Sequence, residues 1–286
     1  MTVIATDLDR TLLPDGGEEY DGTLPVFKKI IKKQKWDLIY ITGRTIKQIK
    51  KAIYKYNVPW PDYILTNVGS RVYGFDKKNK KFKLDKKWFK VIRKNSPEWN
   101  KKKIKKYLKG ISGLWLQEKK RQDKFKISYY VDLSLEKNVL KKVNKNLKEF
   151  GGIKIIYSVD YPKPRGLLDI MTKKGTKKGA LDYILKKNNK KIKEVLYCGD
   201  SGNDLSLLAS KYDSVVVANA PENVKKQAKK QKPDKTKLYI AKKQKYLNGN
   251  YVSGIIQGLV YFKMIDKKTV SGLIKKYRKK ENKFRE

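Results

Sequence analysis

The chain opens with the stretch T-V-I-A-T-D-L-D-R-T-L-L, residues 2–13. Its apolar run at 3–5 is typical of a buried strand, and the run is followed by two acids, Asp7 and Asp9. In an open α/β sheet, ligands bind beyond the carboxyl ends of the strands. Two carboxylates this close repel each other unless a cation lies between them or one is protonated. The stretch also fits a strand that runs into an acidic turn, so its meaning depends on the rest of the chain.

Strands and helices alternate after this stretch. Residues 24–35 have apolar side chains at helical spacing, and 36–41 (W-D-L-I-Y-I) indicate a buried strand that ends at Thr42. A second helix is expected from residue 46 and a third strand at 62–66. This alternation predicts a Rossmann-like core, which is a doubly wound parallel sheet of the α/β class.

The pattern changes between about residues 76 and 164, where lysine-rich helices and alternating strands predict a small α+β unit with antiparallel strands. The α/β rhythm then resumes with a strand at 166–171, a helix that begins near Lys178, and a buried strand at 195–198. A basic segment, which we expect to fray, ends the chain. We therefore predict three parts: a discontinuous catalytic core (1–75 and 165–265), an inserted α+β cap (76–164) and a basic C-terminal tail (266–286).

The composition excludes several kinds of chemistry. The 286 residues include no histidine and a single cysteine, Cys198, so intrachain disulfides, Ser-His-Asp triads, Cys-His dyads and His-ligated zinc are all excluded. The chemistry must use carboxylates, lysines, hydroxyls or a metal bound through oxygen. We expect no secretory signal, because the first residues lead directly into a strand and an acidic turn, and no apolar run reaches the ~18 residues that span a bilayer. We expect a soluble cytoplasmic protein with no membrane partner.

The formal net charge is +43, from 71 basic and 28 acidic residues, which raises the question of nucleic-acid binding. Only eight of the basic residues are Arg, the side chain that best reads bases and clamps phosphates. The lysines are spread from Lys28 to Lys283 rather than gathered in one stripe. A general compositional bias toward lysine is therefore favoured over a nucleic-acid surface.

Chemically useful groups stand at the ends of the predicted strands and at one helix start. Because parallel strands present their carboxyl ends at one edge of a sheet, we expect these groups to converge. Carboxylates without histidine suit Mg²⁺, and a lysine beside a hydroxyl suits a phosphoryl group. An aspartate can attack phosphorus, and a second can pass a proton to the leaving oxygen. The groups are Asp7 and Asp9, Thr42 with Gly43 and Arg44, Lys178, and Asp200 with Asp204.

The motifs D-L-D-x-T, T-G-R, K-G and G-D-S-G-N-D occur in this order, and together they resemble those of the haloacid dehalogenase (HAD) superfamily of phosphatases. The long interval between the second and third motifs resembles the Cof-like branch, whose cap is inserted there. Three further strings are similar to those of the sucrose-phosphate phosphatase group. They are P-D-Y-I-L-T-N-V-G-S (61–70), K-F-K-I-S-Y-Y-V-D (124–132) and V-V-V-A-N-A (215–220).

The resemblance implies roles for the residues in these motifs. Asp7 would be the nucleophile and Asp9 the general acid and base. Mg²⁺ would be held by Asp7, the main-chain carbonyl of Asp9 and Asp200. The supporting residues of this metal site would be Asn203 and Asp204. The residues at the phosphoryl group would be Thr42, Gly43 and Lys178, and those facing the sugar from the cap would be Gln117, Lys126 and Ser128.

Several assignments have a structural alternative. Thr42 also fits a helix N-cap, although the glycine after it favours close approach of the backbone to a ligand. Lys178 is preferred to its neighbour Lys177 because it precedes Gly179 at the helix start. Asp204 also fits a carboxylate that stabilises the start of a helix. The polar cap residues also fit an ordinary solvated sheet face.

We therefore predict a Mg²⁺-dependent phosphomonoesterase that acts on a sugar phosphate through an aspartyl-phosphate, with sucrose 6-phosphate as the first candidate. Arg10 stands where plant and cyanobacterial members usually have Asn, which leaves the sugar open. Another glycosyl phosphate, such as mannosyl-3-phosphoglycerate, is the enzymatic alternative. A nucleic-acid-binding protein on a HAD-like fold is the alternative from a different class. A glycosyltransferase (synthase) is a candidate partner, and the sequence leaves the oligomeric state open.

Overall fold

The computed structural model describes residues 2–160 and 164–283, and the chain forms two compact units. The first unit comprises Met1–Ile41, Ile46–Tyr63 and Lys190–Glu286. The second comprises Thr42–Thr45 and Ile64–Asn189. In the part of the chain that the structure describes, no helix is both long enough and apolar enough to cross a membrane.

The first unit is built on a parallel sheet with the strand order β12-β11-β10-β1-β2. In its centre, Ala5 of β1 lies between Ile39 of β2 and Tyr197 of β10. These central strands are buried along nearly their whole length, as expected for a parallel sheet covered on both faces. The predicted Rossmann-like α/β core is confirmed. The strands are β1 (Val3–Thr6), β2 (Asp37–Ile41), β10 (Val195–Gly199), β11 (Asp213–Val216) and β12 (Leu238–Ile240).

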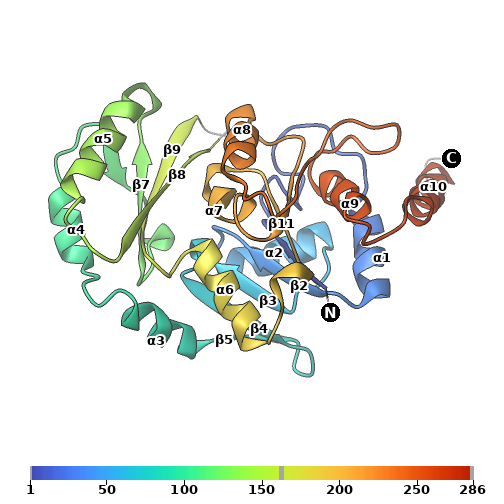
Figure 1. Ribbon diagram of the computed structural model, residues 1–286, viewed down its shortest axis with the longest axis horizontal. Coiled ribbons are helices and arrows are strands. Elements are labelled where there is room, and N and C mark those ends of the chain that lie inside the picture. The colour runs from blue at the N-terminus through green and yellow to red at the C-terminus, as the bar shows by residue number, and fades with distance from the viewer. Residues whose placement is uncertain (1, 161–163, 284–286) are drawn as a thin grey trace. The chain divides into compact units, whose positions relative to one another are not determined.

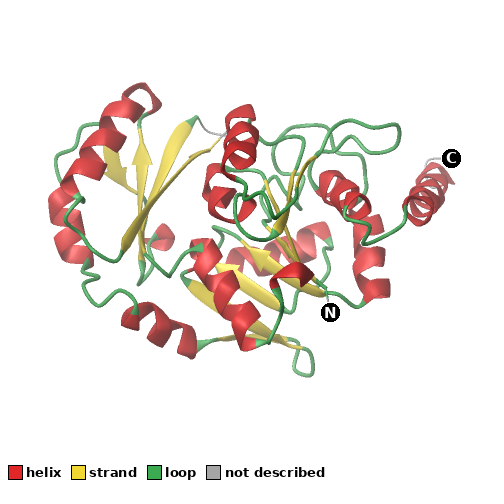
Figure 2. Ribbon diagram, viewed as in Figure 1, coloured by secondary structure: helices red, strands yellow, loops and turns green. Residues whose placement is uncertain are grey.

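Helices pack on this sheet, in one place through a glycine. Pro25 lies in the first turn of α1, where a backbone N–H has no partner within the helix. Helix α9 packs on β11, and a Cβ added at Gly258 would lie 2.2 Å from a methyl group of Val215, so only glycine allows this approach. Helix α1 packs against α9 and α10 (Figure 2). The helices of the first unit are α1 (Leu24–Gln34), α2 (Ile46–Tyr56), α7 (Leu205–Leu208), α8 (Glu222–Gln231), α9 (Val252–Tyr261) and α10 (Lys267–Lys283).

The predicted basic tail is an ordered helix for most of its length. Helix α10 packs against α1, and it buries Val270 and Ile274. These two residues are four positions apart, so they lie on one face of the helix and supply an apolar contact despite the many lysines. The expectation that this segment frays was therefore wrong for α10. Residues 284–286 of the predicted tail lie outside the described residues.

The second unit contains the inserted α+β structure as an antiparallel sheet with the order β6-β7-β9-β8. One face of this sheet is covered by α4 and α5 (Figure 1). Ile127 and Tyr129 of β7 pack there with Ile104 and Val143 of the helices. The elements are α4 (Lys101–Leu108), β6 (Leu114–Leu116), β7 (Lys126–Val131), α5 (Glu136–Asn146), β8 (Ile153–Asp160) and β9 (Arg165–Thr172).

Other elements of the second unit lie before and after this insertion. Strands β4 and β5 form an antiparallel hairpin. A short 3-10 turn, η1, joins β3 to β4, and α6 follows β9 after a short loop. The elements are β3 (Tyr63–Thr66), η1 (Asn67–Gly69), β4 (Arg71–Asp76), β5 (Lys81–Leu84), α3 (Lys86–Lys94) and α6 (Lys177–Lys187).

Strand β9 differs from the expectation. Residues 166–171 were expected to form a strand of the core sheet, whereas β9 pairs antiparallel with β7 and β8. Leu168 and Ile170 alternate into the apolar core under α4 and α5, which is the period of a strand with one buried face. The inserted sheet therefore extends to Thr172, and the predicted boundary at residues 164–165 falls within the β8–β9 pair.

Candidate active site

Asp7 lies at the carboxyl end of the central strand. Its backbone N–H donates to the carbonyl of Cys198 at 2.9 Å, so the pairing of β1 with β10 continues to Asp7 itself. The chain then turns, because the N–H groups of Leu12 and Leu13 both donate to the carbonyl of Leu8, at 3.0 and 2.8 Å. Asp9 lies half-buried in this turn, and the Asp7 side chain is buried. The first strand thus presents both acids at one edge of the parallel sheet.

Asp200 occupies the equivalent position after β10. The hydroxyl of Thr11 donates to its Oδ1 at 2.9 Å. The Nε of Arg10 lies 3.6 Å from its Oδ2. Both oxygens of Asp200 therefore contact the turn that follows Asp7, and this fixes the orientation of a buried carboxylate.

Asp204 is engaged by hydrogen bonds from its own loop. Its Oδ2 accepts from the N–H of Asp200 at 3.3 Å and from the N–H and hydroxyl of Ser201 at 3.1 and 3.0 Å. Its Oδ1 accepts from the hydroxyl of Tyr197. Burial, together with the negative charges of Asp204 and Asp7, raises the pKa of Tyr197, so this hydroxyl remains a donor. Asp204 therefore shapes the loop that carries Asp200.

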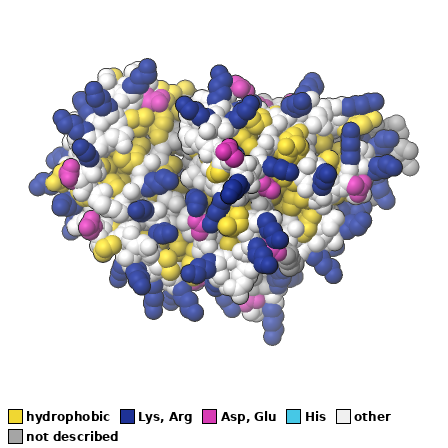
Figure 3. Space-filling model, in the orientation of Figure 1, with side chains coloured by type: hydrophobic (Ala, Val, Ile, Leu, Met, Phe, Trp, Pro, Cys, Tyr) yellow, Lys and Arg dark blue, Asp and Glu magenta, His cyan; other side chains and the backbone are white. Residues whose placement is uncertain are grey.

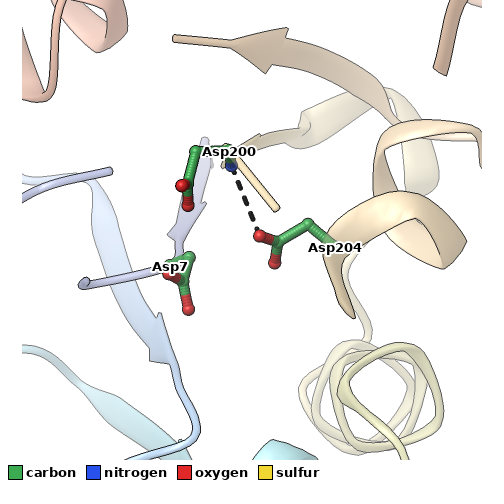
Figure 4. A group of neighbouring side chains, drawn as sticks. All are labelled: Asp7, Asp200 and Asp204. Atoms are coloured by element: carbon green, nitrogen blue, oxygen red, sulfur yellow. Dashed lines mark hydrogen bonds between the residues drawn. The ribbon is translucent and has the colours of Figure 1, made fainter. Parts of the chain in front are cut away.

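Asp7, Asp200 and Asp204 form a buried group in which one oxygen from each lies within 4.8 Å of the others (Figure 4). Two unit charges at this separation repel by about 3 kcal/mol at an effective dielectric constant near 20. The Oδ1 of Asn203 is also buried, and it has no hydrogen-bond partner among the described residues. A buried cluster of hard oxygen donors with closely spaced negative charges fits Mg²⁺.

Arg10 holds the loop after β1 in place. It has a left-handed backbone with φ 61°. Its guanidinium donates to the carbonyls of Gly16 and Asn219 at 3.1 and 3.2 Å and pairs with the Glu18 carboxylate. Glu18 in turn accepts a hydrogen bond of 2.6 Å from the hydroxyl of Tyr251. Sequence reasoning noticed Arg10 but missed Glu18 and Tyr251, which are 233 positions apart and belong to no motif.

The loop that contains Thr42 and Gly43 belongs to the second unit, where η1 supports it. The N–H of Thr42 donates to the carbonyl of Leu65 at 2.9 Å, and its carbonyl accepts from the N–H of Val68 at 3.0 Å. Its hydroxyl accepts from the N–H of Arg44 at 3.1 Å. Because α2 begins only at Ile46, Thr42 is not the N-cap of that helix.

Two neighbouring lysines at the start of α6 differ in their surroundings. Lys177 is 1% exposed, whereas the Lys178 side chain is 36% exposed and pairs with Asp182 at 2.7 Å. Thr176 is the N-cap and accepts from the N–H of Gly179. The helix therefore begins at Lys177, and the next side chain is rotated by about 100° around the axis. The structure favours Lys177 over the predicted Lys178 as a lysine held inside the fold.

The predicted cap residues Lys126 and Ser128 lie together on β7. The Nζ of Lys126 donates to the hydroxyl of Ser128 at 2.6 Å and lies 3.3 Å from the Oδ1 of Asp169. The Ser128 hydroxyl donates to the same oxygen at 2.5 Å. Both residues are buried, so this is not an ordinary solvated sheet face. Gln117 lies beside them, and its side-chain amide donates to the carbonyl of Tyr129 at 2.9 Å.

The predicted site residues thus fall into two groups. The first unit holds Asp7, Asp9, Asp200, Asn203 and Asp204, and the second unit holds Thr42, Gly43, Gln117, Lys126, Ser128 and Lys178. Outside these groups, lysine and arginine side chains are spread over the face shown in Figure 3. On that face they do not gather into one stripe. This agrees with the sequence, which predicted dispersed lysines.

Comparison with known proteins points to one family. The family model for sucrose-6F-phosphate phosphohydrolase matches residues 1–263. A putative HAD-like hydrolase of Nitrosococcus oceani is 31% identical over 266 residues, which cover 91% of this chain and 71% of that protein. Probable sucrose-phosphatase 1 of Arabidopsis thaliana is 27% identical over 276 residues, covering 92% of this chain. The chain spans 60% of the length of that plant relative.

The fold is also similar to that of solved structures. The X-ray structure of the sucrose-phosphatase from Synechocystis sp. PCC6803, in complex with sucrose and phosphate, gives a TM-score of 0.77 at 23% identity. The match covers 92% of this chain and 98% of that chain. The predicted HAD-like core with an inserted cap is therefore the fold of this protein.

Proposed function

Because the chain belongs to the sucrose-6F-phosphate phosphohydrolase family of the HAD superfamily, we propose that it is a Mg²⁺-dependent phosphomonoesterase that hydrolyses a sugar phosphate. Sucrose 6-phosphate is the substrate that we propose first. The observation that carries the proposal is the buried group of Asp7, Asp200 and Asp204 at the ends of two adjacent parallel strands. Such a group is costly for a fold that has no cation to bind there.

In the proposed reaction, a carboxylate oxygen of Asp7 attacks phosphorus as the bond from phosphorus to the sugar oxygen breaks. Asp9 gives its proton to that leaving oxygen and later takes a proton from the water that hydrolyses the aspartyl-phosphate. The burial of each acid suits its role. Asp7 is buried and held by the backbone of β10, whereas Asp9 is half-buried in the following turn.

The proposed Mg²⁺ ligands are Asp7, Asp200 and the main-chain carbonyl of Asp9. When bound, the ion supplies positive charge that offsets the charge of the phosphoryl oxygens and of the carboxylates. Asp204 supports the site, because its oxygens already accept hydrogen bonds from the protein. Asn203 brings a buried carbonyl oxygen, which is suited to a metal ion or a bound water.

The phosphoryl group is bound, in this proposal, by the Thr42 hydroxyl, the backbone at Gly43 and a lysine. We assign the lysine to Lys177 rather than to the predicted Lys178. The side chain of Lys177 is enclosed at the start of α6, whereas Lys178 is partly exposed and paired with Asp182. A buried ammonium group stabilises phosphoryl charge more than a solvated one does, because water screens it less.

The cap supplies contacts to the sugar in this proposal. Lys126, Ser128 and Asp169 form a connected set of donors and acceptors on β7 and β9, which is the type of group that recognises hydroxyls. Gln117 lies next to them, and the carbonyl oxygen of its side chain supplies a further acceptor. A glycosyltransferase that makes the sugar phosphate is the proposed partner in the pathway.

One assay tests the proposal. Phosphate release is measured with Mg²⁺ from a panel that contains sucrose 6-phosphate, mannosyl-3-phosphoglycerate, glucose 6-phosphate and p-nitrophenyl phosphate. The proposal predicts the highest kcat/KM for a disaccharide phosphate and no release by Asp7→Asn. Absence of release from every compound would overturn it. A salt titration with random-sequence DNA tests the alternative from the other class, for which tight and steeply salt-dependent binding is expected.

A further inference from the structure

A buried carboxylate lies in the loop just before β7, outside the predicted site. The side chain of Asp123 is 1% exposed. It accepts hydrogen bonds from the Nε of Arg71 at 2.5 Å and from the hydroxyl of Ser70 at 3.0 Å. The side-chain amide of Asn67 lies 3.3 Å from its Oδ2. Three side chains from residues 67–71 thus converge on one carboxylate from the inserted cap.

The segment 67–71 also holds the Thr42 loop. The N–H of Asn67 donates to the carbonyl of Arg44 at 3.1 Å, and that of Val68 donates to the carbonyl of Thr42 at 3.0 Å. Both residues have a left-handed backbone, with φ 50° for Asn67 and 62° for Val68. For a β-branched residue this conformation is strained and persists only where the surroundings enforce it. The contacts with Asp123 are part of those surroundings.

On its other side, Asp123 is tied to the polar strand of the cap. Its N–H donates to the carbonyl of Lys126 at 3.2 Å, and its carbonyl accepts from the Lys101 ammonium at 2.6 Å. Lys126 is the first residue of β7, and Ser128 follows on the same face. Asp123 therefore connects the loop that binds the phosphoryl group with the strand that carries Lys126 and Ser128, and all these residues lie in the second unit.

The charge of Asp123 is important for this connection. Burial lowers the pKa of Arg71, but Asp123 and Tyr73 together outweigh it through charge and hydrogen bonds, so the pKa of Arg71 is raised. An uncharged acceptor would retain the shape of the contact but would lose the charge-assisted hydrogen bond, which is the stronger kind. Replacement of Asp123 by Asn therefore weakens the connection with little change in side-chain volume.

We propose that Asp123 is a positioning residue that sets the place of β7 relative to the Thr42 loop and so matches sugar recognition to phosphoryl binding. The inference rests on the proposed function. It predicts that an Asp123 variant is impaired mainly with sugar phosphates. A substrate without a sugar uses the phosphoryl-binding loop and the carboxylates but not β7. A residue that only stabilises the fold affects both kinds of substrate alike.

The test compares two substrates in two variants. In Asp123→Asn, the KM for the best sugar phosphate should rise about tenfold with little change in kcat, because a small misplacement of binding groups costs this much or more. The KM for p-nitrophenyl phosphate should rise by a clearly smaller factor, because the Thr42 loop keeps its backbone hydrogen bonds with Leu65 and Val68. Asp85→Asn is the matched control, since Asp85 accepts hydrogen bonds from Tyr183 and Lys187 at 3.0 and 2.7 Å within the same unit. It should lower the melting temperature without changing the ratio of the two KM values.

Equal changes for both substrates, or no change, in Asp123→Asn would overturn the inference. If this variant does not fold, Ser70→Ala removes one donor to Asp123 and should give a smaller shift of the same ratio. Hydrogen exchange tests the role of Asp123 independently of the proposed function. Even if the wild-type protein hydrolyses no phosphomonoester, Asp123→Asn should increase exchange in both 64–71 and 123–131. An increase confined to 123–131 would show that the two segments are not coupled.

Discussion

Lys178 pairs with Asp182 one turn further along α6, while Lys177, the residue before it, is buried at the first position of the same helix. Adjacent lysines of identical chemistry thus have different surroundings. If Lys177 binds the phosphoryl group, Lys177→Met should lower kcat/KM by about 10²–10³-fold, the usual effect of removing one electrostatic contact to a transition state. Lys178→Met is the matched control and should stay within about threefold of wild type. The reverse order of effects would restore the assignment to Lys178.

Because three carboxylates lie close together in the core, replacing Asp7 by Asn should lower activity but raise stability in the absence of metal. Asp7→Asn should reduce turnover by at least about 10⁴-fold, because the nucleophile is lost. In metal-free buffer the same variant should have a higher melting temperature than wild type, because one of three repelling charges is removed. Thermal unfolding in EDTA checks the second part. A variant that melts below wild type in EDTA would show that other contacts of Asp7 outweigh the repulsion.

Mg²⁺ should stabilise the wild-type protein. A ligand that binds only the folded state at 100 times its Kd adds about 2.7 kcal/mol, which corresponds to a shift of several degrees in Tm. Asp200→Asn should remove most of this shift. Asn203→Ala should remove part of it if the buried Oδ1 contacts the ion or a bound water. Melting curves with Mg²⁺ and with the same concentration of Na⁺ separate binding from ionic strength.

The contact of Tyr251 with Glu18 predicts a pH-dependent contribution to stability. Burial raises the pKa of Glu18, but hydrogen bonds from Tyr251 and Arg10 outweigh it, so its pKa in the folded protein is below the ordinary 4.5. A carboxyl with a lowered folded pKa stabilises the protein above its unfolded pKa and loses that contribution as the pH falls through the folded value.

Tyr251→Phe should therefore cost about 1 kcal/mol of unfolding free energy at pH 7. The difference from wild type should shrink as the pH is lowered from about 5 toward 3, because Glu18 becomes protonated in both proteins. Urea unfolding at several pH values measures this. If the difference in unfolding free energy between Tyr251→Phe and wild type does not depend on pH, the hydroxyl contributes through packing of the ring edge and not through the charge of Glu18.

The parallel core was predictable because its strands are continuous apolar runs that end in recognisable motifs. The same criterion wrongly assigned β9 to the core sheet. In β9, Leu168 and Ile170 alternate with half-buried residues, which is the pattern of a strand with one apolar face. It also missed the packing of α10, where Val270 and Ile274 are the buried residues among the positions whose side chains the structure describes. Short or one-sided apolar patterns are weak signals in a chain in which lysine occupies most of the remaining positions.

Within the candidate site, the motifs led directly to the acids but not to the groups that hold them. Choosing between Lys177 and Lys178 required the exact start of α6, and the available signal was Thr176 as N-cap. Arg10, Glu18 and Tyr251 meet only through the fold, since the last of them lies more than 230 positions from the other two. Contacts between such distant residues leave no local pattern in a single sequence.

The dispersed lysines give this protein the behaviour of a polycation. A net charge of +43 makes copies of the chain repel one another and pushes each folded unit toward expansion. Dissolved anions counter both effects, and at 0.1 M salt they screen charges over about 10 Å. The ionic strength of the surroundings thus contributes to holding the fold together, alongside the contacts within the chain.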